Sequence, residues 1–284
     1  MNEIQIDHGP LRVVEESPAY WRAVFDSPPL NLVGRAVIED LYRLLARMDA
    51  SEELRVVVFE SANPDFFLAH YDMSGDTADV VRRAGRSGLG QPHDVLLRLA
   101  EHPVVSIAKI RGRARGIGSE FVLACDIRFA SRENTLLGQP EAGSGVIPGA
   151  GGTERLPLLV GRGRALEIIL GSDDFDGETA ERYGYVNRAL PDAELDDFVD
   201  SFARRIASFD RRPLAAAKRL VNQVSLPSVD RLLDGRRAFS EALTWPETHK
   251  RQAALFKRGM QQEGDLEDHF GAHLADLLGD DVED

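Results

Sequence analysis

The sequence predicts an α/β fold, because short apolar runs of strand type alternate along the chain with segments of helical periodicity. The runs RVVVFE at 55–60 and VVSIAKI at 104–110 are rich in β-branched residues and have the length of buried strands. Apolar residues recur every three or four positions at 36–49, which predicts an amphipathic helix. The length of 284 residues fits one large domain, or one domain with an extension.

The first half of the chain mixes both kinds of element. Strands are predicted at 11–14, 20–25, 55–60, 104–110 and 127–130, and helices at 36–49, at 92–100 and from Ile117 onward. Pro92 suits the first turn of its helix, where no backbone N–H partner is needed. Gly112, Gly116 and Gly118 predict a sharp backbone turn between the strand at 104–110 and the next helix.

The second half is predicted to be mainly helical. Helices are expected from Thr153, at 162–170, 178–183, 194–208, 213–224, 229–244 and 247–262. Gly171 is the expected C-cap of the helix at 162–170. Two polar stretches are expected to be non-regular: a solvated loop at 75–91, with Arg82, Arg83 and Arg86, and a frayed acidic tail at 279–284.

The charge balance argues against some classes of partner. Asp and Glu number 47 against 34 Lys and Arg, a formal charge of −13, which disfavours nucleic acid and anionic membranes. Cys125 is the single cysteine, and it is expected to be a small buried apolar residue in a reducing compartment. The N-terminal residues lack the pattern of a signal peptide, and no apolar run approaches the roughly 20 residues of a membrane span. We therefore expect a cytoplasmic protein.

Two glutamates stand out in the stretch from His102 to Leu156. Glu120 lies near the start of the helix predicted from Ile117, and Glu141 lies in a second glycine-containing turn. The N-terminus of a helix offers unpaired N–H groups. Two carboxylates among such donors suit proton transfer beside a developing oxyanion. The alternative is purely structural: Glu120 would cap its helix and Glu141 would be a surface turn residue.

Nucleotide and metal sites find little support. The glycines at 112–118 have the spacing G-x-x-x-G-x-G, which differs from the dinucleotide fingerprint, and there is no P-loop. His93 and His102 have no Cys, His or Asp partner at metal-ligand spacing, so both are expected to be surface or capping residues. No metal site is predicted.

Several blocks of the sequence resemble the crotonase (enoyl-CoA hydratase/isomerase) superfamily. These are FFLAHYDM at 66–73, HPVVSIAKIRG at 102–112, GIGSEFVLACD at 116–126 and GQPEAGSGVIPGAGGTERL at 138–156. The resemblance implies a ClpP/crotonase-like spiral of ββα units with a C-terminal helical extension. Residues 1–205 would form the core with the active site. Residues 206–284 would cover the site and build a homotrimer or homohexamer.

The resemblance also implies a reaction and roles for four residues. The reaction is the reversible addition of water to a 2-enoyl-CoA thioester through a stabilised enolate. Glu120 would activate the water and Glu141 would transfer the C2 proton. The backbone N–H groups of Tyr71 and Ile117 would form the oxyanion hole. Coenzyme A would enter as part of the substrate, with no other cofactor.

Further substrate contacts follow from the same resemblance. They are expected at Ala69, His70, Asp72, Gly116, Pro140, Gly149 and Lys257. Asp72 has a second interpretation as the cap of the following turn, and Ser144 is either pocket-lining or a turn hydroxyl.

The chain departs from the family pattern at three places. His70 and Ile117 replace glycines that are usual in the family, and Pro64-Asp65 replaces a lysine that is often near the CoA phosphates. These departures leave other functions open: a double-bond isomerase, a retro-Claisen hydrolase or a decarboxylase, or a homologue that binds acyl-CoA or a protein without turnover. Gly149 stands where dienoyl-CoA isomerases of the family carry an aspartate, which argues against that branch.

Overall fold

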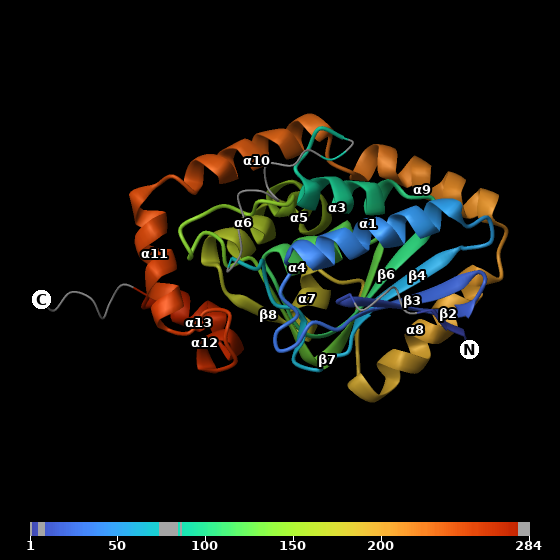
Figure 1. Ribbon diagram of the computed structural model, residues 1–284, viewed down its shortest axis with the longest axis horizontal. Helices are drawn as coiled ribbons and strands as arrows, with labels where there is room; N and C mark the ends of the chain where they lie inside the picture. The colour runs from blue at the N-terminus through green and yellow to red at the C-terminus, as the bar shows by residue number, and fades with distance from the viewer. Residues whose placement is uncertain (1, 5–8, 74–84, 86, 278–284) are drawn as a thin grey trace, which may run out of the picture.

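The computed structural model describes residues 2–4, 9–73, 85 and 87–277. Within these residues the strands form one mixed sheet in the order β1-β2-β3-β4-β6-β7-β8, with β5 paired to β6 and β9 paired to β7. The central pairs β3–β4, β4–β6 and β6–β7 are parallel, whereas β2–β3 and β7–β8 are antiparallel. The predicted α/β class is therefore confirmed (Figure 1).

The strands are β1 (Asn2–Ile4), β2 (Leu11–Ser17), β3 (Tyr20–Phe25), β4 (Val56–Ser61), β5 (Phe66–Leu68), β6 (Val105–Arg115), β7 (Ile127–Gly138), β8 (Asp174–Asp176) and β9 (Arg188–Leu190). The helices are α1 (Arg35–Ala50), α3 (Gln91–Glu101), α4 (Ile117–Ala124), α5 (Gly152–Val160), α6 (Arg162–Gly171), α7 (Gly177–Tyr183), α8 (Asp192–Ala207), α9 (Arg211–Ser225), α10 (Val229–Ala242), α11 (Pro246–Lys257), α12 (Asp265–Asp268) and α13 (Phe270–Ala275).

Helices cover both faces of the sheet, as the near-continuous apolar strands require. Alternate residues of β4 point to opposite faces, with Val57 and Phe59 in one apolar cluster and Val56 and Val58 in another. The first cluster packs α1, α3 and α4 onto the sheet. The second packs α8 onto the other face (Figure 1). This packing brings the C-terminal end of β6 and the N-terminus of α4 to the edge of the core, where the site lies.

The two central strands are longer than the sequence predicts. Strand β6 continues to Arg115 and β7 continues to Gly138. Gly112 has a positive φ of 72° but does not end β6; it marks a register shift against β7 instead. On β7, residues 131–134 lie in this shift, between the partners Ala130 and Thr135. The short strands β5, β8 and β9 have too few residues for a periodic signal, and none was predicted.

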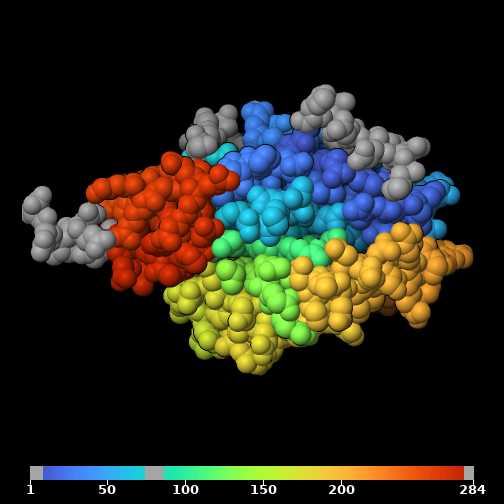
Figure 2. All heavy atoms as spheres, turned by 90° about the horizontal axis from the view of Figure 1, so that it is seen from below, coloured from blue at the N-terminus to red at the C-terminus, as the bar shows by residue number. Residues whose placement is uncertain are grey.

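The last predicted helix, at 247–262, is shorter at its C-terminal end than expected. The predicted helix 247–262 ends at Lys257, because Gly259, Gln261 and Gly264 adopt positive φ values of 99°, 67° and 150°. Two further short helices, α12 and α13, follow this turn. Figure 2 shows the C-terminal residues packed as a block at one end of the molecule.

Two smaller expectations are corrected. His93 and His102 are buried, with 7% and 6% of their surface exposed, so neither is a surface residue, although His102 is the C-cap residue of α3. Gly171 is the last residue of α6, and Ser172 takes the left-handed cap position. Cys125 is buried as expected. Most of the predicted loop at 75–91, including Arg82, Arg83 and Arg86, and all of the acidic tail at 279–284 lie outside the described residues.

Candidate active site

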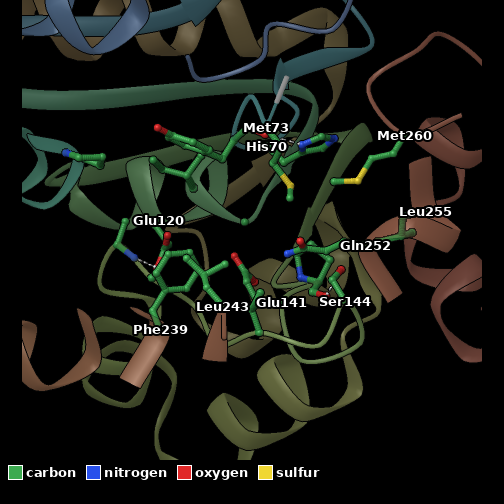
Figure 3. A pocket seen from close by; sticks show the side chains of 18 of the residues that line it. His70, Met73, Glu120, Glu141, Ser144, Phe239, Leu243, Gln252, Leu255 and Met260 are labelled. Atoms are coloured by element: carbon green, nitrogen blue, oxygen red, sulfur yellow. Dashed lines mark hydrogen bonds between the residues drawn. The ribbon is translucent and has the colours of Figure 1, made fainter. Parts of the chain in front are cut away.

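A cavity of about 400 Å³ opens beside the N-terminus of α4. Its lining comes from two parts of the chain. We call the turns after β5, β6 and β7 the floor, and α10, α11 and the segment that follows α11 the roof. Figure 3 shows side chains from both parts around the cavity. Both predicted glutamates line it, together with Tyr71 and Ile117. The structure therefore brings together residues that the sequence separates by dozens of positions.

Glu120 lies in the first turn of α4 and is 1% exposed. Its Oε1 accepts hydrogen bonds from Ala150 N at 2.7 Å and from Gly152 N at 2.8 Å. These donors belong to the glycine-rich turn before α5, which wraps around the carboxylate. Arg155 lies behind them and donates from a buried guanidinium to Ala150 O at 2.8 Å. The structural role considered for Glu120, capping its own helix, is not what this geometry shows.

Glu141 follows Pro140 in the turn after β7. Its Oε2 is buried and has no hydrogen-bond partner among the described residues. Its Oε1 lies over Gly116, where a Cβ atom would stand only 2.9 Å away. Gly116 also has a positive φ of 52°, so a side chain is disfavoured there twice over. An unpartnered carboxylate in a cavity is costly for the protein alone and is available to a ligand.

The two carboxyl groups titrate in different surroundings. Burial raises the pKa of Glu120 to about 7, while the N–H groups of Gly152 and Ala150 and the charge of Arg155 limit the increase. Burial also raises the pKa of Glu141 well above its ordinary value, and the charge of Glu120 raises it further. The two N–H donors and Arg155 favour the ionised form of Glu120, whereas Glu141 has no comparable donor and is disfavoured as a carboxylate.

Two backbone N–H groups in the cavity lining have no hydrogen-bond acceptor among the described residues. Val33 N donates to His70 O at 2.8 Å and Asp72 N donates to Val33 O at 3.1 Å, which turns the intervening Tyr71 N–H to the opposite side. Ile117 is the first residue of α4, so its N–H has no acceptor within the helix. Tyr71 and Ile117 both line the cavity.

The other predicted contacts divide into two groups. His70, Gly116, Pro140 and Gly149 line the cavity. Ala69, Asp72 and Lys257 are not among its lining residues. Asp72 lies instead against Gly34, at the start of α1.

Ser144 fits both of its sequence interpretations. It lines the cavity, and its hydroxyl donates to Pro140 O at 2.9 Å within the turn.

Several residues that shape the site were not predicted. The roof is mainly apolar and comes from Phe239, Leu243, Leu255 and Phe270 of the C-terminal helices, with Arg236 and Gln252 as polar exceptions. The hydrophobic periodicity of these helices was visible, but nothing local indicated which of their apolar residues face the core and which face a cavity. The glycine cluster at 149–152 was a stronger signal for the Ala150 and Gly152 donors.

The described residues contain neither a metal-binding cluster nor a membrane-spanning helix. No group of three or more His, Cys, Asp or Glu side chains there is placed to hold a metal ion. No helix in the same residues has the length and hydropathy to cross a bilayer.

Comparison with known proteins places the chain in a family. The family model described as enoyl-CoA hydratase/isomerase matches residues 22–261. A short-chain-enoyl-CoA hydratase from Clostridium acetobutylicum is 32% identical over 206 residues, which are 72% of this chain and 77% of that protein. A crotonyl-CoA hydratase from Syntrophomonas wolfei is 30% identical over 207 residues, with 72% of this chain and 78% of that protein covered.

The fold comparison agrees. A crystal structure of a candidate enoyl-CoA hydratase from Streptomyces avermitilis has a TM-score of 0.91 and 43% sequence identity, covering 97% of this chain and 99% of that one. The chain belongs to the enoyl-CoA hydratase/isomerase family. The crotonase fold and the assignment to an enoyl-CoA hydratase-like class of enzymes are thereby confirmed.

Proposed function

We propose that this protein catalyses the reversible addition of water to the double bond of a 2-enoyl-CoA. The thioester oxygen would lie between the N–H groups of Tyr71 and Ile117, which stabilise the negative charge of the enolate. Ionised Glu120 would take a proton from water as the water attacks C3. Protonated Glu141 would deliver a proton to C2. Coenzyme A enters as part of the substrate, and the proposal needs no other cofactor.

The observation that carries this proposal is the unequal pair of buried carboxyl groups. Hydration needs one base and one acid in the same cavity at the same pH. Glu120 is held by two N–H donors, which favour its ionised form, whereas burial and the charge of Glu120 favour the protonated form of the unpartnered Glu141. The apolar roof excludes water from the acyl group and strengthens both polar interactions.

The test is incubation of the purified protein with crotonyl-CoA, followed by mass spectrometry of the acyl-CoA. We expect a gain of one water molecule. Glu120→Gln and Glu141→Gln each keep the shape of the side chain but remove the carboxyl chemistry, and each should lower kcat by at least about 100-fold. Full activity in either variant would contradict the assigned role. A product without added water would favour another reaction of the family.

We further infer that the protein is a cytoplasmic homotrimer or homohexamer. Helix α9 supports the inference because it has no buried residue within the single chain. Leu220, Val221 and Val224 are 55%, 60% and 85% exposed along it. An apolar stripe of this kind favours burial against a second copy. In such an assembly Lys257, which does not line the cavity of its own chain, would contact CoA bound by a neighbouring copy.

A further inference from the structure

The turn that carries Tyr71 is joined to the far end of the chain. We call residues 259–275, which comprise the turn after α11 with α12 and α13, the C-terminal strap. Its apolar residues Met260, Leu266 and Phe270 form one cluster with Leu255 of α11, and Met73 packs against this cluster. Arg115 at the end of β6 donates to Glu267 O at 2.6 Å and anchors the strap to the sheet.

His70 makes the closest side-chain connection between the strap and the site. Its Nε2 lies 2.9 Å and 3.1 Å from the two carboxylate oxygens of Glu267, which is fully buried. Its Nδ1 lies 3.1 Å from Tyr71 O. The ring of Phe270 packs beside the imidazole, with 5.6 Å between ring centroids. Both ring nitrogens are therefore engaged, so His70 is not placed to carry a proton to the substrate.

Glu267 connects His70 with a third residue. Its Oε1 also accepts a hydrogen bond from Gln261 N at 2.7 Å, and the side-chain Nε2 of Gln261 donates to Tyr71 O at 2.9 Å. Burial opposes ionisation of Glu267, but the hydrogen bond and charge of His70, with Gln261 and Arg115, hold its pKa below the ordinary value. The carboxylate is thus the common acceptor of the strap and of the oxyanion turn.

These contacts act on the peptide units on both sides of Tyr71. Val33 holds the preceding peptide through His70 O and the following one through Asp72 N. Tyr71 O in the following peptide is held from the other side by Gln261 and His70. The Tyr71 N–H lies in the plane of the His70–Tyr71 peptide, which runs between the Cα atoms of these two residues. The His70 ring, held by Glu267, fixes one end of this peptide, and the contacts to Tyr71 O fix the other. A loosened strap would therefore let this donor rotate.

We propose that His70 and Glu267 are positioning residues that fix the Tyr71 N–H as an oxyanion donor, so that the C-terminal strap completes the active site. The inference rests on the proposed function, because it needs an acyl thioester in the cavity. It also explains how histidine is accommodated at a position where the enoyl-CoA hydratase/isomerase family usually has glycine. The imidazole contacts to Glu267 and Tyr71 O restrict the backbone at this position, which a glycine would leave free.

The experiment uses butyryl-CoA labelled with ¹³C at the thioester carbonyl. This acyl group has no double bond, so its carbonyl stretch can be measured in the bound state by infrared difference spectroscopy without turnover. Oxyanion donors polarise the carbonyl, and we expect a shift to lower wavenumber in the wild-type protein. His70→Ala and Glu267→Ala should lose the part of that shift that the Tyr71 N–H supplies, while the Ile117 N–H keeps the remainder. With crotonyl-CoA they should lower kcat about 10- to 100-fold at a KM changed less than about threefold.

Glu267→Gln is the conservative variant. Its amide carbonyl can accept from Gln261 N, and its NH₂ can donate to His70 Nε2 while Nδ1–H donates to Tyr71 O. It should therefore restore most of the carbonyl shift that Glu267→Ala loses. The matched control is Glu263→Ala, an exposed acid of the same strap, which should behave as the wild type.

The outcomes distinguish failure of the positioning role from failure of the proposed function. A wild-type carbonyl shift that persists in both alanine variants, or a Glu267→Gln protein as impaired as Glu267→Ala, overturns the positioning role and leaves the proposed function standing. No carbonyl shift and no hydration in the wild type overturn the proposed function itself. Circular dichroism checks folding. If an alanine variant does not fold, Gln261→Gly, which suits the positive φ of that residue, decides: a partly lost shift supports the proposal and an unchanged shift contradicts it.

Discussion

At the scale of single residues, the chemistry depends on how differently the fold treats two identical side chains. Glu120 receives two backbone donors and lies near a buried arginine. Glu141 Oε2 has no hydrogen-bond donor among the described residues, and burial and the negative charge of Glu120 raise the pKa of Glu141. Helix position alone would have favoured ionised Glu120, but burial outweighs that effect and raises the pKa of both groups.

This difference predicts a bell-shaped dependence of kcat/KM on pH. The acidic limb should lie near pH 7, because Glu120 must be ionised to accept a proton from water. The alkaline limb should lie higher, where Glu141 loses its proton. Both limbs belong to the coupled pair rather than to one residue.

Arg155→Met tests the assignment of the acidic limb, because removing this buried positive charge should move the limb to higher pH. The matched control is Arg162→Met on the surface, which should leave the profile unchanged. An acidic limb that stays in place in Arg155→Met would contradict the assignment.

A second prediction concerns the pH dependence of the free energy of unfolding. The folded-state pKa of Glu141 is raised above the ordinary value of 4.5, so its favourable contribution is complete below pH 4.5 and is lost as pH rises through the raised pKa. Glu141→Gln should therefore melt higher than the wild type at pH 8 but not at pH 4.5, by roughly 2–4 °C for each kcal/mol. Calorimetry at both values checks this. The exposed Glu52→Gln is the control, and an equal difference at both pH values would argue against a buried, protonated Glu141.

At the scale of elements, α9 shows how a helix without a buried face is fixed to the core. Lys218 reaches inward and donates to Asp126 Oδ2 at 2.6 Å and to Val104 O at 3.0 Å. The same Asp126 oxygen accepts from Ser106 N and from its hydroxyl. One lysine thus connects α9 with the start of β6 and with the loop between α4 and β7.

Removing only one partner of this ion pair should lower the free energy of unfolding more than replacing both partners. Lys218→Met should lower the free energy of unfolding by about 3 kcal/mol, because it leaves a largely buried carboxylate unpaired. The double variant Lys218→Met with Asp126→Asn should recover much of that loss. Urea denaturation of the single and double variants measures the coupling. Arg219→Met, one residue along the exposed face of α9, is the control. Additive effects of Lys218→Met and Asp126→Asn would show that the ion pair does not hold the helix.

At the scale of the whole molecule, the cavity depends on contacts between the two ends of the chain. Its floor comes from residues 70–150 and its roof from residues beyond 235.

The exposed apolar stripe of α9 predicts that copies of the chain assemble through this helix. Val224→Asp should shift the protein toward monomers in analytical ultracentrifugation, whereas the exposed Gln223→Asp should not. A wild-type protein that sediments as a monomer would remove the basis for the proposed trimer or hexamer.

Much of this protein could be predicted from local patterns. Periods of two and of three to four residues located β2, β3, β4 and most helices, because each element has one face that must be buried. The glycine turns and the helix start around Glu120 and Glu141 indicated both carboxylates, because such features can be recognised in a short stretch. The donors Tyr71 and Ile117 were predicted only from the family resemblance. Elements of three residues, and the continuation of β6 through Gly112, were missed because partner strands decide them.

The tertiary structure alone decided how those parts act on one another. The sequence places Glu267 in an acidic stretch like many others, yet folding buries it against His70, almost 200 positions earlier in the chain. The unequal environments of Glu120 and Glu141 arise in the same way, from donors and charges supplied by another turn. Residue types and short spacings set which groups are available, whereas burial and long-range contacts set their pKa values, because desolvation and Coulomb energy depend on distance in space rather than along the chain.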